Sequence, residues 1–330
     1  MDEILSRLEA YRQKGLINAK FSSVIRDFYE SYQQALASSS NLEKGRQLFG
    51  QLLELIIDNI RHPRPFSIFH RSVRHPFDYY QFGLDFIRPC IDFPRSKVSG
   101  SPTLDVICEQ LKRRDNIILF ANHQTEPDPP IISLLLEKSH PQLASEMVFV
   151  AGDRVTTDPS AIPMSLGRHL LCIHSKKHMA YPPEQKTQKI LHNRRTLQKI
   201  QELLDEGGYC IYVAPSGGRD RPNEKGEVTP APFDPSSIEC FWLMGRQARR
   251  PTHFYPLTLH TYHLMPPPLS VEQELGERRS IHFSPIYLSF GQEIDMDHFP
   301  GSEGVEKKIL RTKRAEYIWQ QVCESYRAFE

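Results

Sequence analysis

Hydrophobic residues in the first 60 positions recur at intervals of three and four, which is the spacing of one face of an α-helix. The polar stretch 38–41 interrupts this pattern, and Pro63 ends it because proline cannot continue a helix. Ser22 and Ser23 are candidate N-caps. We expect short helices that pack into a small N-terminal bundle. Their apolar stripes are Ile4, Leu5, Leu8 and Tyr11, then Val24, Ile25, Phe28 and Tyr32, then Leu48, Leu52, Leu55, Ile56 and Ile60.

From about residue 76 the pattern changes to short apolar runs that alternate with amphipathic stretches. This alternation favours an α/β fold with a mixed, largely parallel sheet flanked by helices. We therefore predict two domains, a helical bundle over 1–75 and an α/β domain over 76–330. The expected strands are Asn116–Ala121, Met147–Ala151, Leu170–Ile173 and Tyr209–Ala214, and helical candidates are Pro130–Lys138 and Thr196–Glu206.

The composition narrows the classes of protein to which the chain can belong. Of its 330 residues 39% are hydrophobic and 25% are charged, as is typical of a globular protein. Its net charge is only +1, so it lacks the overall basic character of a nucleic-acid-binding protein. No apolar run approaches the roughly 18 residues of a membrane span. The six cysteines are scattered, and we expect them to be reduced.

Polar clusters follow three of the expected strands. They occupy residues 122–128, 175–178 and 214–222. In an open α/β sheet the functional groups gather in loops beyond the carboxyl ends of the strands. We therefore expect the chemistry of this chain in these three loops.

The first of these loops contains His123 and Asp128. Residues five apart do not share a helical face, but a turn can bring them together, and Pro127 and Pro129 disfavour a helix there. An aspartate bonded to one imidazole nitrogen leaves the other nitrogen as a base. Of the 14 histidines only His123 has an aspartate five positions later. The alternative is that Asp128 merely caps the following helix.

The other two loops are basic. Glycines at 217 and 218 allow a ligand to approach the backbone, and guanidinium groups suit phosphate oxygens. Solvated surface charge is the alternative reading of each cluster. Taken together, however, the three loops predict a general base beside an anion-binding wall. The basic residues are Lys177, His178, Arg219 and Arg221.

Residues 122–128 resemble the NHx4D motif of the glycerolipid acyltransferases. The wider sequence is most similar to the soluble glycerol-3-phosphate acyltransferases of plant plastids and their bacterial relatives. This resemblance spans roughly residues 76 to 300, and 66–74 match less well. It is carried by segments 76–80, 82–83 and 87–89, then 121–126, 151–155, 175–179, 214–222 and 265–268.

The resemblance implies transfer of a fatty acyl group from a thioester of acyl carrier protein or coenzyme A. The acceptor would be the sn-1 hydroxyl of glycerol 3-phosphate, and the product lysophosphatidic acid, in the first step of phospholipid synthesis. His123 would be the general base and Asp128 would orient it. No cofactor or metal is implied. The phosphate would be bound by Lys177, His178, Arg219 and Arg221.

The resemblance also raises the question of location. The plastid enzymes carry a transit peptide, and acidic residues follow Met1 here. We expect a soluble enzyme of the bacterial cytoplasm, or a trimmed mature form in the plastid stroma. Transient contact with a membrane surface would help product release. No nucleic-acid partner is expected.

Two other classes of function stay open at this point. A serine hydrolase could use Ser216 with His123 and Asp128, although residues 214–218 lack the GxSxG elbow. A non-catalytic phosphate- or lipid-binding module would keep the basic residues without needing His123.

Overall fold

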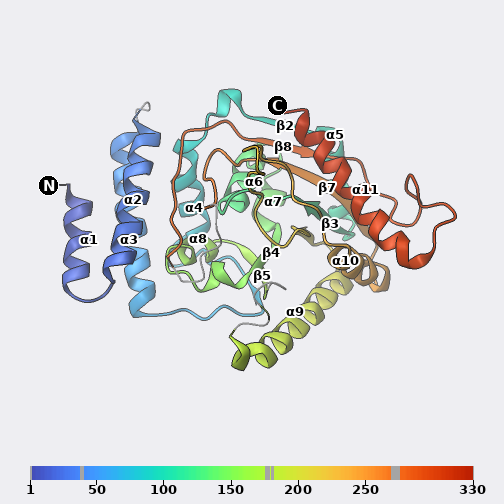
Figure 1. Cartoon of the computed structure of the whole chain (residues 1–330), viewed down its shortest axis with the longest axis horizontal. Helices are drawn as coiled ribbons and strands as arrows, with labels where there is room; N and C mark the ends of the chain where they lie inside the picture. The colour runs from blue at the N-terminus through green and yellow to red at the C-terminus, as the bar shows by residue number, and fades with distance from the viewer. Residues whose placement is uncertain (1, 38–40, 175–178, 180–181, 269–275, 330) are drawn as a thin grey trace.

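The computed structural model describes residues 2–37, 41–174, 179, 182–268 and 276–329. Three helices lie side by side at the N-terminal end of the chain: α1 (Glu3–Gln13), α2 (Ala19–Leu36) and α3 (Leu42–Arg61) (Figure 1). The predicted helical N-terminus is therefore confirmed. The predicted N-caps were wrong, because α2 begins a turn earlier. Its cap is Asn18, whose side chain accepts a 2.8 Å hydrogen bond from the Phe21 N–H.

Aromatic rings fill the core of these helices and join them to α4 (Tyr79–Ile87). The Phe49 ring lies 4.8 Å from that of Tyr29, and Tyr32 stacks on Phe86 at 4.5 Å. The Tyr32 hydroxyl also donates to the Phe86 carbonyl at 2.8 Å. The core of the bundle thus continues into α4, just beyond residue 75. The division into domains 1–75 and 76–330 stays a prediction.

The described residues form one sheet of eight strands in the order β1-β5-β4-β6-β3-β7-β8-β2. The strands from β5 to β7 in this order are parallel, whereas β1 and β8 run antiparallel to their neighbours β5 and β7. The predicted mixed, largely parallel sheet is confirmed. The strands are β1 (Phe69–His70), β2 (Lys97–Ser99), β3 (Asn116–Ala121), β4 (Val148–Gly152), β5 (His169–Ile173), β6 (Cys210–Val213), β7 (Thr252–His260) and β8 (Tyr287–Phe290).

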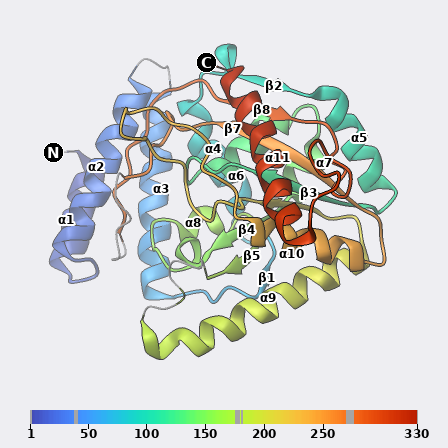
Figure 2. The same ribbon diagram turned by 45° about the vertical axis from the view of Figure 1, so that its right-hand side comes forward.

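Helices cover both faces of this sheet (Figures 1 and 2). Alternate residues of β3 point to opposite faces: Ile117 and Leu119 pack in one core, and Ile118 and Phe120 pack in the other. The first core is shared with α5 (Ser101–Lys112), α6 (Asp128–Leu136) and α7 (Pro141–Glu146). The second is shared with α9 (Lys186–Glu206), α10 (Pro235–Gln247) and α11 (Lys307–Arg327). The short α8 (Ile162–Ser165) lies near α3 and α4.

Two expectations about helices need correction. Pro127 and Pro129 do not keep residue 128 out of a helix, because Asp128 is the first residue of α6. Proline is tolerated in a first helical turn, where the backbone N–H groups have no partner within the helix. The second predicted helix, Thr196–Glu206, begins ten residues earlier as α9. Among the described residues, no helix is long and apolar enough to span a bilayer.

Candidate active site

His123 lies just beyond the carboxyl end of β3, in the short loop that leads into α6. Its Nδ1 is 2.7 Å from Oδ2 of Asp128, so the structure brings the two predicted residues together. The His123 side chain is 29% exposed, whereas that of Asp128 is 1% exposed. A carboxylate can only accept hydrogen bonds, so Nδ1 carries the proton and Nε2 is left as the basic nitrogen.

The Asp128 carboxylate is held by three further donors. The backbone N–H groups of Gln124 and Thr125 donate to Oδ2 at 2.9 and 3.2 Å. The Thr261 hydroxyl donates to Oδ1 at 2.6 Å. Asp128 also lies in the first turn of α6, where the helix dipole favours negative charge. A buried carboxylate, fixed by several donors, is therefore built into the start of α6.

A second buried aspartate ties the loop after β6 to the loop after β3. The backbone N–H of Asp220 donates to the His123 carbonyl at 2.6 Å. Its carboxylate accepts hydrogen bonds from the Asn122 side chain at 2.9 Å and from the Ala231 N–H at 2.8 Å. Because Asp220 lies between Arg219 and Arg221, these bonds bring the basic loop alongside the histidine.

Burial raises the pKa of Asp220 to about 6, although the Ala231 N–H, the Asn122 amide and His123 all pull in the opposite direction. The rest of the Asn122 amide is also satisfied. It donates to the Leu259 carbonyl at 2.9 Å and accepts from the Leu259 N–H at 2.8 Å. Asn122, in the loop after β3, therefore links the loop that follows β6 to strand β7.

The two predicted arginines have different surroundings. Arg219 forms a salt bridge with Glu277, which also faces Arg154 at 3.7 Å. Arg221 donates to the carbonyl of Pro268 at 3.2 Å. Burial lowers the pKa of Arg221, and the neighbouring charge of Arg219 lowers it further. These two cations therefore lie close enough to repel one another, and an anion placed between them would relieve that repulsion. The other predicted phosphate ligands, Lys177 and His178, lie outside the described residues.

A buried arginine that the sequence analysis missed, Arg279, anchors the loop that carries His123. Arg279 forms a salt bridge to Glu126 at 2.9 Å and another to Asp158 at 3.3 Å. Burial alone would lower the pKa of Arg279, but these two carboxylates outweigh it and the pKa is raised. The pairing joins segments more than 100 residues apart, so no short motif could have revealed it.

Ser216 does not have the surroundings of a nucleophile. Its hydroxyl donates to the Gly218 carbonyl at 3.0 Å, within its own turn. Gly217 has a φ of +67°, a conformation that favours glycine, and it shapes this turn. Among the described residues, no group of three histidine, cysteine, aspartate or glutamate side chains is arranged to hold a metal ion.

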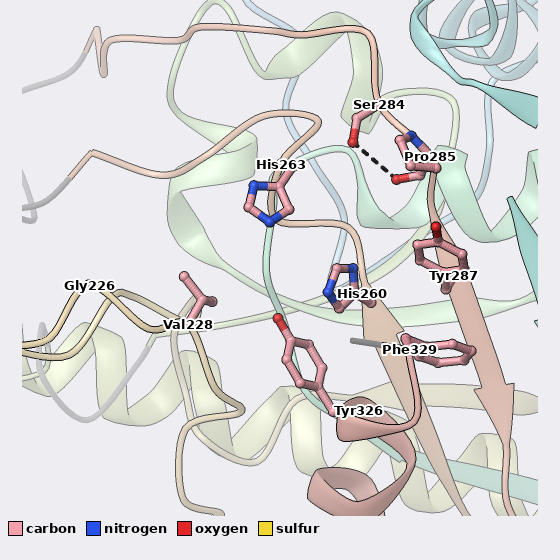
Figure 3. A pocket seen from close by; sticks show the side chains of 9 residues that line it. All are labelled: Gly226, Val228, His260, His263, Ser284, Pro285, Tyr287, Tyr326 and Phe329. Atoms are coloured by element: carbon pink, nitrogen blue, oxygen red, sulfur yellow. Dashed lines mark hydrogen bonds between the residues drawn. The ribbon is translucent and has the colours of Figure 1, made fainter. Parts of the chain in front are cut away.

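A pocket of about 550 Å³ opens at the carboxyl end of β7 (Figure 3). Its described lining is rich in aromatic rings and contains no Asp, Glu, Lys or Arg, and it does not include His123 or Arg219. Tyr326, which lines the pocket, accepts a 3.1 Å hydrogen bond from the side-chain amide of Gln124 in the loop that carries His123. The lining residues are Gly226, Val228, His260, His263, Ser284, Pro285, Tyr287, Tyr326 and Phe329.

Comparison with known proteins gives a consistent result. The family model described as Acyltransferase matches residues 104–259, which include the His123 loop and the basic loop. A chloroplastic glycerol-3-phosphate acyltransferase of Cucurbita moschata is 38% identical over 98% of this chain and 71% of its own length. The enzyme of the same name from Pisum sativum is 38% identical over 98% of this chain and 72% of its own length. The chloroplastic glycerol-3-phosphate acyltransferase of Arabidopsis thaliana is 38% identical over 89% of this chain and 65% of its own length.

These similarities cover nearly the whole chain, including the helical bundle and the α/β part. They exclude the serine hydrolase and the non-catalytic module as readings of the three loops. The chain belongs to the family of glycerol-3-phosphate acyltransferases.

Proposed function

We propose that this enzyme uses His123 as the general base that transfers a fatty acyl group to the sn-1 hydroxyl of glycerol 3-phosphate. The observation that carries the proposal is the 2.6 Å hydrogen bond from the Asp220 N–H to the His123 carbonyl. It holds the loop with Arg219 and Arg221 against the loop with the base. An acceptor whose phosphate binds to the arginines would then have its hydroxyl within reach of the imidazole.

The chemistry follows from the protonation of the histidine. Nε2 of His123 takes the proton from the attacking hydroxyl, and the imidazolium that forms is stabilised by the Asp128 carboxylate. The oxygen attacks the thioester carbonyl, and the thiol of the carrier leaves with a proton returned from the imidazolium. The products are lysophosphatidic acid and the free thiol, so no cofactor is consumed.

The phosphate site supplies orientation. We assign Lys177, His178, Arg219 and Arg221 to the dianion, since guanidinium forks and amines make charge-assisted hydrogen bonds to phosphate oxygens. Arg219 already pairs with Glu277, so phosphate binding would exchange or extend that salt bridge. Holding the two reactants in contact can supply about 7–11 kcal/mol of the barrier reduction.

For the donor we propose the thioester of acyl carrier protein, with coenzyme A as an alternative carrier. The setting we propose is the plastid stroma, as the chloroplastic names of the relatives suggest, or the bacterial cytoplasm. The lysophospholipid product would leave by transient contact with a membrane surface.

The test is replacement of His123 by Ala. Turnover should fall by about 10²–10⁴-fold, the usual contribution of a general base, while glycerol 3-phosphate still binds in calorimetry. A matched control is His253→Ala. The His253 imidazole also has a carboxylate partner, Glu293 at 2.6 Å. It lies near the amino end of β7, however, whereas His123 lies beyond the carboxyl end of the neighbouring parallel strand β3. Near-normal rates for the His123 variant would refute the assignment.

A further inference from the structure

The outer face of α9 combines exposed apolar and cationic side chains. Ile190, Leu191 and Leu197 are 49%, 47% and 37% exposed. Arg194 and Arg195 are exposed beside them on the helix. The inner face packs on the sheet through residues of the C-terminal half, and the outward apolar residues are not part of that buried core. In Figures 1 and 2 the helix lies along the periphery of the molecule.

The basic side chains of this helix lie in its first two thirds, and its acidic side chains, Glu202, Asp205 and Glu206, lie near its C-terminal end. Residues 186–199 include five basic and no acidic side chains, although the whole chain is nearly neutral at +1. The last of these cations, Lys199, is paired with Glu202 at 2.9 Å. In the part of the chain that the structure describes, Arg194 and Arg195 have no such acidic partner. Their charge is therefore available to an acidic surface. The five are Lys186, Lys189, Arg194, Arg195 and Lys199.

The middle of α9 is fixed to the carboxyl end of β5, on the side of the sheet where the strands lead into the candidate active site. The Asn193 side chain accepts from the His174 N–H and donates to the His174 carbonyl, both at 2.8 Å. The Thr196 hydroxyl donates to the Cys172 carbonyl at 2.9 Å. Cys172 lies near the end of β5 and His174 directly follows that strand. The strands β5, β4, β6 and β3 are neighbours in this order and all run parallel. The carboxyl end of β5 thus faces the same side as the loop with His123.

We propose that the exposed face of α9, defined as Lys186, Ile190, Leu191, Arg194, Arg195 and Leu197, docks the acidic protein that carries the acyl thioester. The inference rests on the proposed function, whose donor it specifies. A carrier bound at this face would lie beside the active edge of the sheet, where its flexible thiol arm delivers the acyl group. Complementary charge would speed the encounter, and the three aliphatic side chains would contribute a small apolar contact.

The composition of the face favours a protein over a lipid surface. Helices that insert into the membrane interface usually present bulky residues such as Trp and Phe in a continuous apolar face. The docking face of α9 has only three aliphatic residues, two of them adjacent in the sequence, set among polar and charged ones, and no aromatic side chain. Such a mixed surface is typical of a transient contact with another protein.

The experiment compares two carriers with the full-length enzyme. Arg194→Glu combined with Arg195→Glu should lower kcat/KM for palmitoyl-acyl carrier protein by about 10-fold or more, the scale of electrostatic steering. The value for palmitoyl-coenzyme A should change by less than about 2-fold, which also shows that the variant folds. Raising the salt concentration should lower the rate of the wild type with the carrier protein and have little effect on the double variant.

A matched control reverses two lysines on another exposed basic helix start, Lys307→Glu with Lys308→Glu on α11. The charge change is identical, but the two lysines lie at the start of α11. The other end of the helix carries Tyr326, which contacts Gln124 in the loop of the candidate site. An equal loss in the control, an equal loss with both donors, or no loss with the carrier protein would overturn the proposal. Reduced pelleting with anionic phospholipid vesicles at unchanged carrier kinetics would assign the face to a membrane instead. Absence of transfer to glycerol 3-phosphate by the wild type with either donor would refute the proposed function itself.

Discussion

The Thr261 hydroxyl donates a 2.6 Å hydrogen bond to Oδ1 of Asp128, although the two residues are 133 positions apart. Both side chains are buried, and the bond completes the set of donors around the carboxylate that orients His123. Thr261 directly follows β7, the strand that pairs with β3 in parallel. Because the carboxyl ends of β3 and β7 lie side by side, Thr261 lies next to the loop that carries His123.

This relationship predicts that Thr261 is a positioning residue. Replacing it by Val removes the donor while keeping the shape, and leaves one carboxylate oxygen without a partner. The usual cost of about 1–3 kcal/mol corresponds to roughly a 10- to 100-fold lower kcat, with little change in the KM for glycerol 3-phosphate. Thr261→Ser should restore most of the rate. Equal rates for the Val and Ser variants would contradict the role, and thermal melts of both check that folding is intact.

The basic loop leads to a prediction about substrate binding. Arg221→Ala should raise the KM for glycerol 3-phosphate by roughly 10- to 100-fold, since a hydrogen bond to a charged group is worth about 1.5–3 kcal/mol. The KM for the acyl donor should change far less. Arg221→Lys should recover only part of the loss, because an amine lacks the planar fork.

Glycerol, which lacks the phosphate, serves as the control acceptor in these assays. The wild type should use glycerol poorly, and the Arg221→Ala variant should use glycerol at about the same rate as the wild type does. If the wild type accepted glycerol as readily as glycerol 3-phosphate, the loop would not be the phosphate site.

The raised pKa of Asp220 predicts a pH-dependent contribution to stability. Its pKa is about 6 in the folded protein, above the roughly 3.9 of an unfolded chain, so the folded state holds the proton more tightly. The contribution is fully present below about pH 4 and is lost as the pH rises through 6. Two pKa units correspond to about 3 kcal/mol.

The measurement is the free energy of unfolding of the wild type and of Asp220→Asn by urea denaturation between pH 4 and 7. The Asn variant cannot titrate, so the stability of the wild type relative to the variant should fall as pH rises. Asn also replaces one accepting oxygen with a donor, which shifts the difference by the same amount at every pH. A difference that does not vary with pH would show that Asp220 titrates normally.

A fourth prediction concerns covalent intermediates. Burial raises the pKa of the Cys172 thiol to about 12, so it is protonated and unreactive at neutral pH. The Ser216 hydroxyl is engaged with Gly218, and no side chain in the described part of the chain accepts a hydrogen bond from it. The glycerol hydroxyl should therefore attack the thioester directly, with both substrates bound, and initial-rate plots should intersect. An acyl mass added to the intact protein by donor alone, and removed by glycerol 3-phosphate, would contradict this.

Local patterns in the sequence were enough to predict much of the protein. Helical periodicity predicted α1 to α3, and the apolar run before the motif gave β3 with its observed bounds. The spacing of His123 and Asp128 allowed their pairing, and the resemblance to a known motif favoured it; the structure shows the pair across a short loop and the first turn of α6. Arg219 and Arg221 were singled out by their residue types together with their place after an expected strand and the resemblance to a known family.

The long-range contacts were decided by the tertiary structure. Thr261, Asp220 and Arg279 have no distinguishing local signal, and each finds its partner through a crossing of the sheet or a loop 98 or more positions away. The strand β7, which brings Thr261 to the site, was not predicted. Pro256 lies in the middle of this strand, whereas proline is normally found at sheet edges, so the sequence argued against a strand there. Burial of a polar group depends on the whole fold, so only the tertiary structure decided that the Asp220 carboxyl is buried and that its pKa is raised.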